Sequence, residues 1–199
     1  MSKRIMVVAT GNQGKLAEIK ELMADFDFEI LSLEDYPEIG DIEETGNSFA
    51  ENALLKAEAV WKVTHSWVLA DDSGLEVDFL AGAPGIYSAR YAGEEKNDKK
   101  NNQKLLTALR GVPPEKRGAV FRCALALLNP AGEELIFGGE CRGIIAERER
   151  GERGFGYDPL FFLPALNQTM AELEEEEKNS LSHRAKAMEK LMDYLCRSK

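Results

Sequence analysis

Two adjacent carboxylates, Asp71 and Asp72, follow an apolar run at residues 67–70 and precede Ser73 and Gly74. We interpret the run as a strand that ends at the carboxylates, with a Ser-Gly turn after it. Ligands bind outside the carboxyl ends of strands in open α/β sheets. Adjacent carboxylates there repel unless a cation shares them or one takes a proton, which suits Mg²⁺ or a metal ligand beside a general base. Two solvated turn aspartates are the alternative.

A second candidate site is the loop between an apolar run at residues 5–9 and a helical pattern at residues 15–26. Its residues are Thr10, Gly11, Asn12, Gln13, Gly14 and Lys15. Unpaired N–H groups at a helix N-terminus favour an anion, and a Lys adds a point charge suited to a phosphate chain. The spacing is not that of the P-loop. The alternative is a plain strand-to-helix turn in which Asn12 caps the helix and Lys15 lies in solvent.

Acidic residues also precede a second helical pattern, at residues 44–62. Glu43 and Glu44 stand where a helix dipole stabilises negative charge, so a dipole role and metal binding are both open for each of them. Glu51 has the spacing of a capping-box partner of Ser48. Lys56 lies at the edge of the apolar face that the pattern predicts.

A Gly-rich loop and a basic segment follow later in the chain. The loop contains Phe155, Gly156, Tyr157 and Asp158, and the segment contains Lys178, His183 and Arg184. An exposed aromatic ring can stack on a base, and a carboxylate can accept hydrogen bonds from a base edge. A Phe in the core beside an Asp-Pro turn is the alternative for the loop. His183 and Arg184 begin the last predicted helix, where cations oppose the dipole unless an anionic or polar partner meets them.

Both helices and strands must position these residues. Strand, loop and helix open the chain as an α/β unit, and an alternating segment that turns at residues 129–132 predicts antiparallel strands. We therefore expect an α/β fold with one mixed sheet, in a single domain over residues 1–199 that is either one body or two lobes.

Composition restricts the partners of the chain. The net charge is −10 over 199 residues, which argues against a duplex nucleic-acid binder but not against a small anionic substrate. No apolar run is long enough for a membrane span, and the N-terminal one is too short for a signal peptide, so we expect a cytoplasmic protein. Cys123, Cys141 and Cys196 have no zinc spacing, and we expect buried or partly buried free thiols.

Six motifs in order resemble the inosine/xanthosine triphosphate pyrophosphatases, over nearly the whole chain. They are TGNQGK, EETGNSFAENALLKA, LADDSGLEVDFLAGAPGIYSARYAG, FRCALAL, GFGYDPLFF and EKNSLSHRAKA. The resemblance implies two lobes around an elongated central sheet flanked by helices, an active-site cleft between the lobes, and a homodimer. It also implies Mg²⁺-dependent hydrolysis of non-standard purine nucleoside triphosphates (ITP, dITP, XTP) to the monophosphate and pyrophosphate, which cleanses the nucleotide pool.

The resemblance also implies roles for residues. The triphosphate is bound by Lys56 and by the loop residues Thr10, Gly11, Asn12, Gln13, Gly14 and Lys15. Ser73 matches a phosphate or substrate contact. Glu43 and Asp72 match the metal-binding positions, Asp72 also matches the proton acceptor, and Asp71 is a catalytic helper. Phe155, Gly156, Tyr157 and Asp158 match the base-side loop, and Lys178, His183 and Arg184 match the cluster that recognises purine oxygens.

One residue departs from the family pattern. The family commonly has Gly-Gly before the FGYDP motif, whereas here Arg153 precedes Gly154. A charged side chain there alters loop flexibility or adds a phosphate contact, which puts fine selectivity in doubt. Two other functions remain open: a pyrophosphatase acting on modified pyrimidine or standard nucleotides, and a nucleotide sensor without turnover. The paired carboxylates argue against the sensor, because binding alone rarely needs a base beside the metal.

Overall fold

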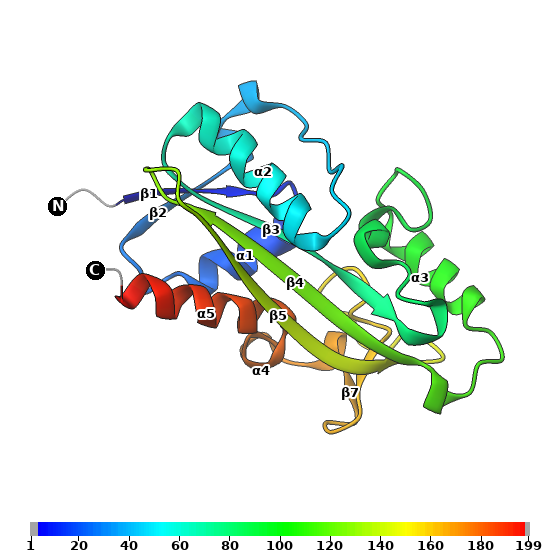
Figure 1. Ribbon diagram of the computed structural model, residues 1–199. Helices are drawn as coiled ribbons and strands as arrows, with labels where there is room; N and C mark the ends of the chain where they lie inside the picture. Colours follow the sequence, from blue (N-terminus) through cyan, green and yellow to red (C-terminus); the bar gives the residue numbers. More distant parts are fainter. Residues whose placement is uncertain (1–3, 198–199) are drawn as a thin grey trace. The chain divides into compact units, whose positions relative to one another are not determined.

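The computed structural model describes residues 4–197, and within this range the chain divides into two compact units. The first unit holds residues up to 72, 123–139 and 184 onward, and the second holds 73–122 and 140–183. Among the described residues, seven strands form a mixed sheet in the hydrogen-bonded order β2-β1-β3-β4-β5-β6-β7. The predicted α/β class with a mixed sheet is confirmed (Figure 1).

The first unit is an α/β unit built on three parallel strands. Strand β1 (Arg4–Ala9) pairs in parallel with β2 (Phe28–Ser32) and with β3 (Trp67–Val77). Three helices belong to this unit, α1 (Gln13–Leu22), α2 (Phe49–Thr64) and nearly all of α5 (His183–Arg197). Parallel strands with helices on both faces read as continuous apolar runs, as residues 6–9 do.

Alternation along the strands distributes the core of the first unit between two faces. Met6 and Val8 of β1 pack with α1 and α5 in one apolar cluster. Val7 and Ala9 are also fully buried, and by alternation they point to the opposite face, where α2 contacts β1. Figure 1 shows α2 on one side of these strands and α1 with α5 on the other. Side chains of β3 therefore face either α2 or the α1–α5 pair.

The second unit has its own apolar core, which includes Leu75 and Val77 of β3. Strands β4 (Gly118–Leu128) and β5 (Glu134–Ile145) are sheet neighbours joined by five residues, too few for a parallel crossover, so the predicted antiparallel pair is confirmed. β6 (Phe161–Leu163) pairs antiparallel with β5 and with β7 (Gln168–Thr169). Helices α3 (Asp98–Ala108) and α4 (Glu175–Leu181) complete the unit.

Short 3₁₀ helices connect these elements. Their bounds are Leu33–Asp35, Pro37–Ile39, Asp78–Leu80, Gly85–Arg90, Pro114–Lys116 and Met170–Glu172. Asp78–Leu80 precedes the Gly- and Pro-rich segment 81–93, and Gly85–Arg90 lies within it. None of the helices within residues 4–197 is long and apolar enough to cross a membrane.

The predicted limits of three elements were wrong. Helix α1 spans Gln13–Leu22 rather than residues 15–26. The chain makes no turn at Ser73 and Gly74, because β3 continues through both residues to Val77. Helix α2 begins at Phe49 rather than at residue 44, since the Ser48 side chain accepts the N–H of Glu51 and caps the helix there.

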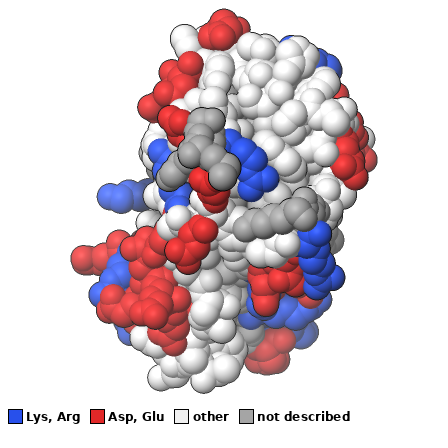
Figure 2. Space-filling model, turned by 90° about the vertical axis from the view of Figure 1, so that its left-hand side faces the viewer, with Lys and Arg blue, Asp and Glu red and all other residues white. Residues whose placement is uncertain are grey.

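The surface carries charges of both signs, and the three cysteines differ in exposure. Figure 2 shows one face of the molecule, on which acidic side chains gather in several patches with Lys and Arg between them. All three cysteines are free thiols, as predicted. Cys123 and Cys141 are buried, whereas Cys196 is exposed, which corrects the expectation of burial for that residue.

Candidate active site

The carboxylate of Asp71 lies at the centre of a buried ion cluster in the first unit. Its Oδ1 binds Lys15 Nζ, and its Oδ2 accepts hydrogen bonds from Arg184 Nε at 2.9 Å and from the Cys123 thiol at 3.2 Å. Arg184 also binds Glu18, which lies three residues after Lys15 on α1. Asp71 is fully buried on the face of β3 that meets α1 and α5.

The electrostatics of this cluster keep Asp71 ionised. Burial opposes the charged form, but the charges of Arg184 and Lys15 outweigh burial and hold the pKa of Asp71 well below its ordinary value. A carboxylate engaged by two cations and a thiol is a weak proton acceptor. The contacts therefore favour a role for Asp71 in fixing Lys15, and its predicted part in catalysis stays a prediction.

Asp72, the next residue along β3, lies in a second set of contacts in the same unit. Its Oδ1 is 2.9 Å from Lys56 Nζ, and the same ammonium group binds Glu44 Oε1 at 2.8 Å. Neighbouring strand residues point to opposite faces, so Asp72 meets α2 while Asp71 meets α1 and α5. The adjacent carboxylates thus bind different lysines, Lys15 and Lys56.

The two oxygens of Asp72 are in different situations. Burial raises the pKa of Asp72 against the lowering effect of Lys56 and Lys15. Oδ2 is buried and has no hydrogen-bond partner among the described residues. A buried unsatisfied acceptor is costly and calls for an explanation such as a water or an ion. Asp72 therefore holds an oxygen that is suited to receive a proton or to contact a cation.

A magnesium ion fits this set of donors. Within residues 4–197, no three His, Cys, Asp or Glu side chains lie close enough to hold a metal by themselves. Mg²⁺, however, is usually bound by one or two carboxylates together with substrate phosphates and water, so it needs no such cluster. The buried Oδ2 of Asp72 is one suitable oxygen ligand. Glu43 is exposed in an irregular segment that ends at the cap of α2.

The observed start of α2 bears on the helix-dipole role suggested for Glu43 and Glu44. Because the helix begins at Phe49, neither Glu43 nor Glu44 lies in its first turn, and the dipole explanation was wrong for both. Glu44 instead pairs with Lys56. Metal binding by Glu43 stays a prediction. Glu51 does cap, but its carboxylate accepts the N–H of Asn47 rather than that of Ser48.

The loop before α1 contains the predicted Asn12 cap, and Lys15 follows it in the first turn of the helix. The Asn12 side chain accepts the N–H of Lys15 at 3.0 Å and caps the helix, which begins at Gln13. Thr10 is buried, and its hydroxyl accepts the N–H of Asn12. Lys15 does not lie in solvent, because its side chain is 14% exposed and bound to Asp71. The interpretation of Lys15 as a solvated turn residue was therefore wrong.

A third set of contacts holds the predicted base-side loop of the second unit. Asp158 Oδ2 accepts hydrogen bonds from Phe155 N at 3.0 Å and from Lys178 Nζ at 2.9 Å. The Lys178 ammonium lies 4.9 Å from the centroid of the half-buried Phe155 ring. Gly154 is required here, because its φ is +76° and a Cβ atom would stand 2.1 Å from Asp158 Oδ2.

Not every residue of this loop is available to a ligand. Tyr157 is buried in the apolar core, and its hydroxyl donates to the carbonyl of Ser88 at 2.8 Å. Burial raises the pKa of Tyr157 well above its ordinary value. The expectation of an exposed stacking aromatic was therefore wrong for Tyr157, and Phe155 is the aromatic that stays partly accessible.

The predicted purine-recognition residues each contact a different residue. Lys178 is bound to Asp158, whereas the ring of His183 stacks on Phe121 with centroids 4.8 Å apart. Arg184 binds Asp71 and Glu18 and is 2% exposed. Consecutive residues point about 100° apart around a helix, so neighbours in sequence need not share a partner. Recognition of purine oxygens by these residues stays a prediction, as does the role of the half-buried Ser73.

The model of the Ham1 family matches residues 6–194. The chain belongs to the Ham1 family. It is 55% identical over 191 residues to the dITP/XTP pyrophosphatase of Listeria monocytogenes, covering 96% of this chain and 93% of that protein. It is 50% identical over 192 residues to the dITP/XTP pyrophosphatase of Desulforamulus reducens, covering 96% of each.

Solved structures of similar proteins have the same fold. The Staphylococcus aureus Ham1 protein has a TM-score of 0.88 at 44% identity, over 98% of this chain and all of that one. The nucleoside-triphosphatase / dITP/XTP pyrophosphatase of Mycobacterium abscessus has a TM-score of 0.77, also at 44% identity, over 94% of this chain and 98% of that one. The family resemblance drawn from the six motifs is confirmed.

Arg153 of this Ham1 family member binds the segment before α4, and the phosphate contact suggested as one of its two effects stays a prediction. Its guanidinium donates to the carbonyls of Glu172 and Leu173, both at 3.3 Å, and lies 2.6 Å from a carboxylate oxygen of Glu174. The side chain thus ties the Gly-rich loop to the segment that leads into α4. This favours the other suggested effect, a change in loop flexibility.

Sequence reasoning missed three residues of the Ham1 site region. Glu18 had a signal, because it stands one helical turn after Lys15, but its polar type suggested a solvent face. Asp98 and Asn102 of α3 both bind the backbone of Gly156, and nothing in their polar surroundings singled them out.

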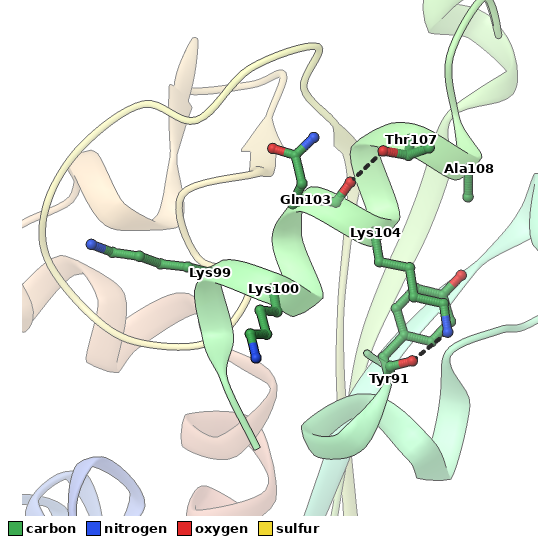
Figure 3. Close-up of a pocket in the computed structure, with 7 residues that line it drawn as sticks. All are labelled: Tyr91, Lys99, Lys100, Gln103, Lys104, Thr107 and Ala108. Atoms are coloured by element: carbon green, nitrogen blue, oxygen red, sulfur yellow. Dashed lines mark hydrogen bonds between the residues drawn. The ribbon is translucent and has the colours of Figure 1, made fainter. Parts of the chain in front are cut away.

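A pocket of this Ham1 protein lies beside α3, away from the predicted site residues. It has a volume of about 580 Å³ and is lined by Tyr91, Lys99, Lys100, Gln103, Lys104, Thr107 and Ala108 (Figure 3). Figure 3 shows Lys104 reaching the carbonyl of Tyr91 across it. No lining residue is among those predicted for the site.

Proposed function

We propose that this chain is a nucleoside triphosphate pyrophosphatase that hydrolyses dITP, ITP and XTP to the monophosphate and pyrophosphate. The relatives named above support the substrate class. The observation that carries the proposal is Asp72, a buried carboxylate with one oxygen held by Lys56 and the other without a partner among the described residues. Such a group suits the activation of water beside cations that bind phosphate.

The chemistry requires a water to be deprotonated and aimed at phosphorus. A new O–P bond forms, the phosphoanhydride P–O bond breaks, and pyrophosphate leaves. Asp72 takes the proton of the water, and its raised pKa makes it a better acceptor than an ordinary aspartate. Lys56 and Lys15 are the cations that stabilise negative charge on the phosphate oxygens. Asp71 holds Lys15 in place through the ion pair.

Magnesium would be held by Asp72 and Glu43 together with the phosphates of the substrate. When bound, the ion neutralises phosphate oxygens and so lowers the barrier to attack. The fit rests on the buried Oδ2 of Asp72, and the second ligand rests on the family resemblance alone.

Base selectivity would come from hydrogen-bond donors that meet a 6-oxo group. Hypoxanthine and xanthine present this acceptor, whereas the 6-amino group of adenine would leave the donors unpaired, which a site of this kind rejects strongly. Lys178 and His183 are the donors of the second unit that the family resemblance assigns to this role, and Arg184 is the third. Phe155 supplies a ring face for stacking.

The assembly and location of the chain are further parts of the proposal. A homodimer in the cytoplasm is what the family resemblance supports. Light scattering on the purified chain would give a mass near twice 22.1 kDa for a dimer, and a mass near 22.1 kDa would contradict it.

Pyrophosphate release measured on a substrate panel tests the proposal. The purified chain is incubated with Mg²⁺ and dITP, XTP, dGTP, dATP or dTTP, and Asp72→Asn is run beside it. Release from dITP and XTP is expected to exceed release from the other three, and Asp72→Asn is expected to be inactive with an unchanged circular dichroism spectrum. Preference for a standard or pyrimidine nucleotide, or binding of dITP without release, would contradict the proposed activity.

A further inference from the structure

Helix α3 holds the backbone of one glycine in the Gly-rich loop from both sides. Asp98 Oδ2 accepts the N–H of Gly156 at 2.8 Å, and Asn102 Nδ2 donates to the carbonyl of Gly156 at 3.2 Å. The two side chains are four residues apart, so they lie one turn apart on the same side of the helix. Together they fix the peptide planes before and after Gly156.

The glycine that they hold stands between the two aromatic residues of the loop. Gly156 has a φ of +62°, so its conformation is one that few other residues would adopt. Phe155 precedes it, and the N–H of Phe155 is bound by Asp158, which also binds Lys178. Fixing the Gly156 peptide therefore fixes the direction in which Phe155 leaves the loop, relative to the Lys178 ammonium.

The buried amide of Asn102 indicates that this side chain does more than fill the core. Asn102 is 3% exposed in the middle of a helix, where a polar group is unfavourable unless it is hydrogen-bonded. Its amide nitrogen also donates to Glu149 Oε1 at 3.0 Å, and its Oδ1 has no hydrogen-bond partner among the described residues. An apolar residue would satisfy the core at lower cost. The amide is therefore best explained by its hold on the loop.

We propose that Asp98 and Asn102 are positioning residues that set base discrimination by fixing the Gly154–Asp158 loop. The inference rests on the proposed function, because it assigns the loop to the purine side of the substrate. Neither side chain belongs to the phosphate-binding or carboxylate groups of the first unit. Their loss affects the placement of Phe155 and Lys178, and it leaves the proton acceptor Asp72 with its own contacts.

Steady-state kinetics on dITP and dGTP test the proposal with four variants. Asp98→Ala and Asn102→Ala each remove a hydrogen bond to Gly156, and Asp98→Asn keeps an acceptor in the same place. Gln103→Ala is the matched control, because Gln103 lies on the same helix and lines the pocket beside Lys104 rather than hydrogen-bonding to Gly156 (Figure 3). The ratio of kcat/KM for dITP over dGTP should fall about three- to tenfold in the two alanine variants, mainly through KM for dITP.

The pattern across variants separates positioning from general damage. Asp98→Asn should recover most of the wild-type ratio, and Gln103→Ala should retain it. Asp98 is exposed, so Asp98→Ala tests the idea even if Asn102→Ala fails to fold. Parallel losses on both nucleotides, or an unchanged ratio in Asp98→Ala, would overturn the positioning role while the activity stands. A wild-type chain that releases no pyrophosphate from dITP would instead overturn the proposed function itself.

Discussion

Lys56 and Asp72 form a nearly buried ion pair, with Nζ and Oδ1 2.9 Å apart and side chains that are 11% and 10% exposed. The pair joins the middle of α2 to the middle of β3. The same ammonium binds Glu44, so one cation serves two carboxylates. Because burial removes the screening of water, the charge of Lys56 acts strongly on Asp72 and on any phosphate placed beside it.

Replacement of Lys56 by Met should therefore abolish most of the activity. The variant keeps an unbranched side chain of similar length but removes the cation, so kcat for dITP should fall about 100-fold or more. Lys62→Met is the control, because Lys62 lies on the same helix with a side chain that is 69% exposed. Pyrophosphate release measures both variants, and activity within a fewfold of wild type in Lys56→Met would rule out a role in binding the phosphates.

The ion cluster around Arg184 predicts a large loss of stability when the arginine is removed. Arg184→Met leaves the buried carboxylates of Asp71 and Glu18 without their shared partner, and breaking a buried ion pair on one side costs about 3–5 kcal/mol. Urea denaturation measures the loss. Arg197→Met on the same helix, with a side chain 82% exposed, should change stability by less than about 1 kcal/mol. Equal effects of the two substitutions would contradict the cluster.

Two glycines of the base-side loop should respond differently to alanine. Gly154 and Gly156 both have positive φ, +76° and +62°, so a residue with a Cβ atom would be strained at either position. Only at Gly154 would a Cβ atom collide with Asp158 Oδ2, whereas open space surrounds Gly156. Gly154→Ala should therefore lower the melting temperature more than Gly156→Ala does. Equal melting temperatures would show that Asp158 moves aside freely.

Acid should weaken the second unit through Glu172. Hydrogen bonding from the Thr169 N–H lowers the pKa of Glu172 below its ordinary value of 4.5, with help from Arg150 and against burial. A carboxyl group with a lowered folded-state pKa stabilises the fold above 4.5 and loses that contribution as pH falls through the folded value. Glu172→Gln should thus be less stable than wild type at neutral pH, and the difference should shrink below pH 4.5.

Urea denaturation of wild type and Glu172→Gln, at neutral pH and below pH 4.5, measures how the stability difference between them changes with pH. Glu176→Gln is the control, because Glu176 is an exposed residue of α4. A difference between wild type and Glu172→Gln that stays constant, or grows, on acidification would contradict the lowered pKa.

Removal of magnesium should stop turnover without unfolding the chain. Two carboxylates and the substrate would share the ion, so the protein alone has little to lose from a chelator. EDTA is expected to abolish pyrophosphate release and to leave the melting temperature of the nucleotide-free chain unchanged. Full activity in EDTA would remove the metal from the mechanism.

Local patterns in the sequence were enough for several features of the site. The Asn12 and Ser48 caps, the parallel unit that opens the chain and the start of the last helix at His183 all depend on residues within a few positions of each other. The predicted end of the strand before Ser73 failed because a nonlocal interaction won. The Ser-Gly pair favours a turn, yet β3 continues through it where the strand is held in the sheet.

The sequence by itself determined the family, the α/β class and which residue types are present at the site, since six ordered motifs and local caps contain that information. Only the tertiary structure decided what each charge does. Asp71 and Asp72 are identical neighbours, but strand alternation points one toward Arg184, 113 residues away, and the other toward Lys56. Partners so distant in sequence are chosen by folding. Ionisation and reactivity depend on those partners and on burial, so residue type alone could not assign the two roles.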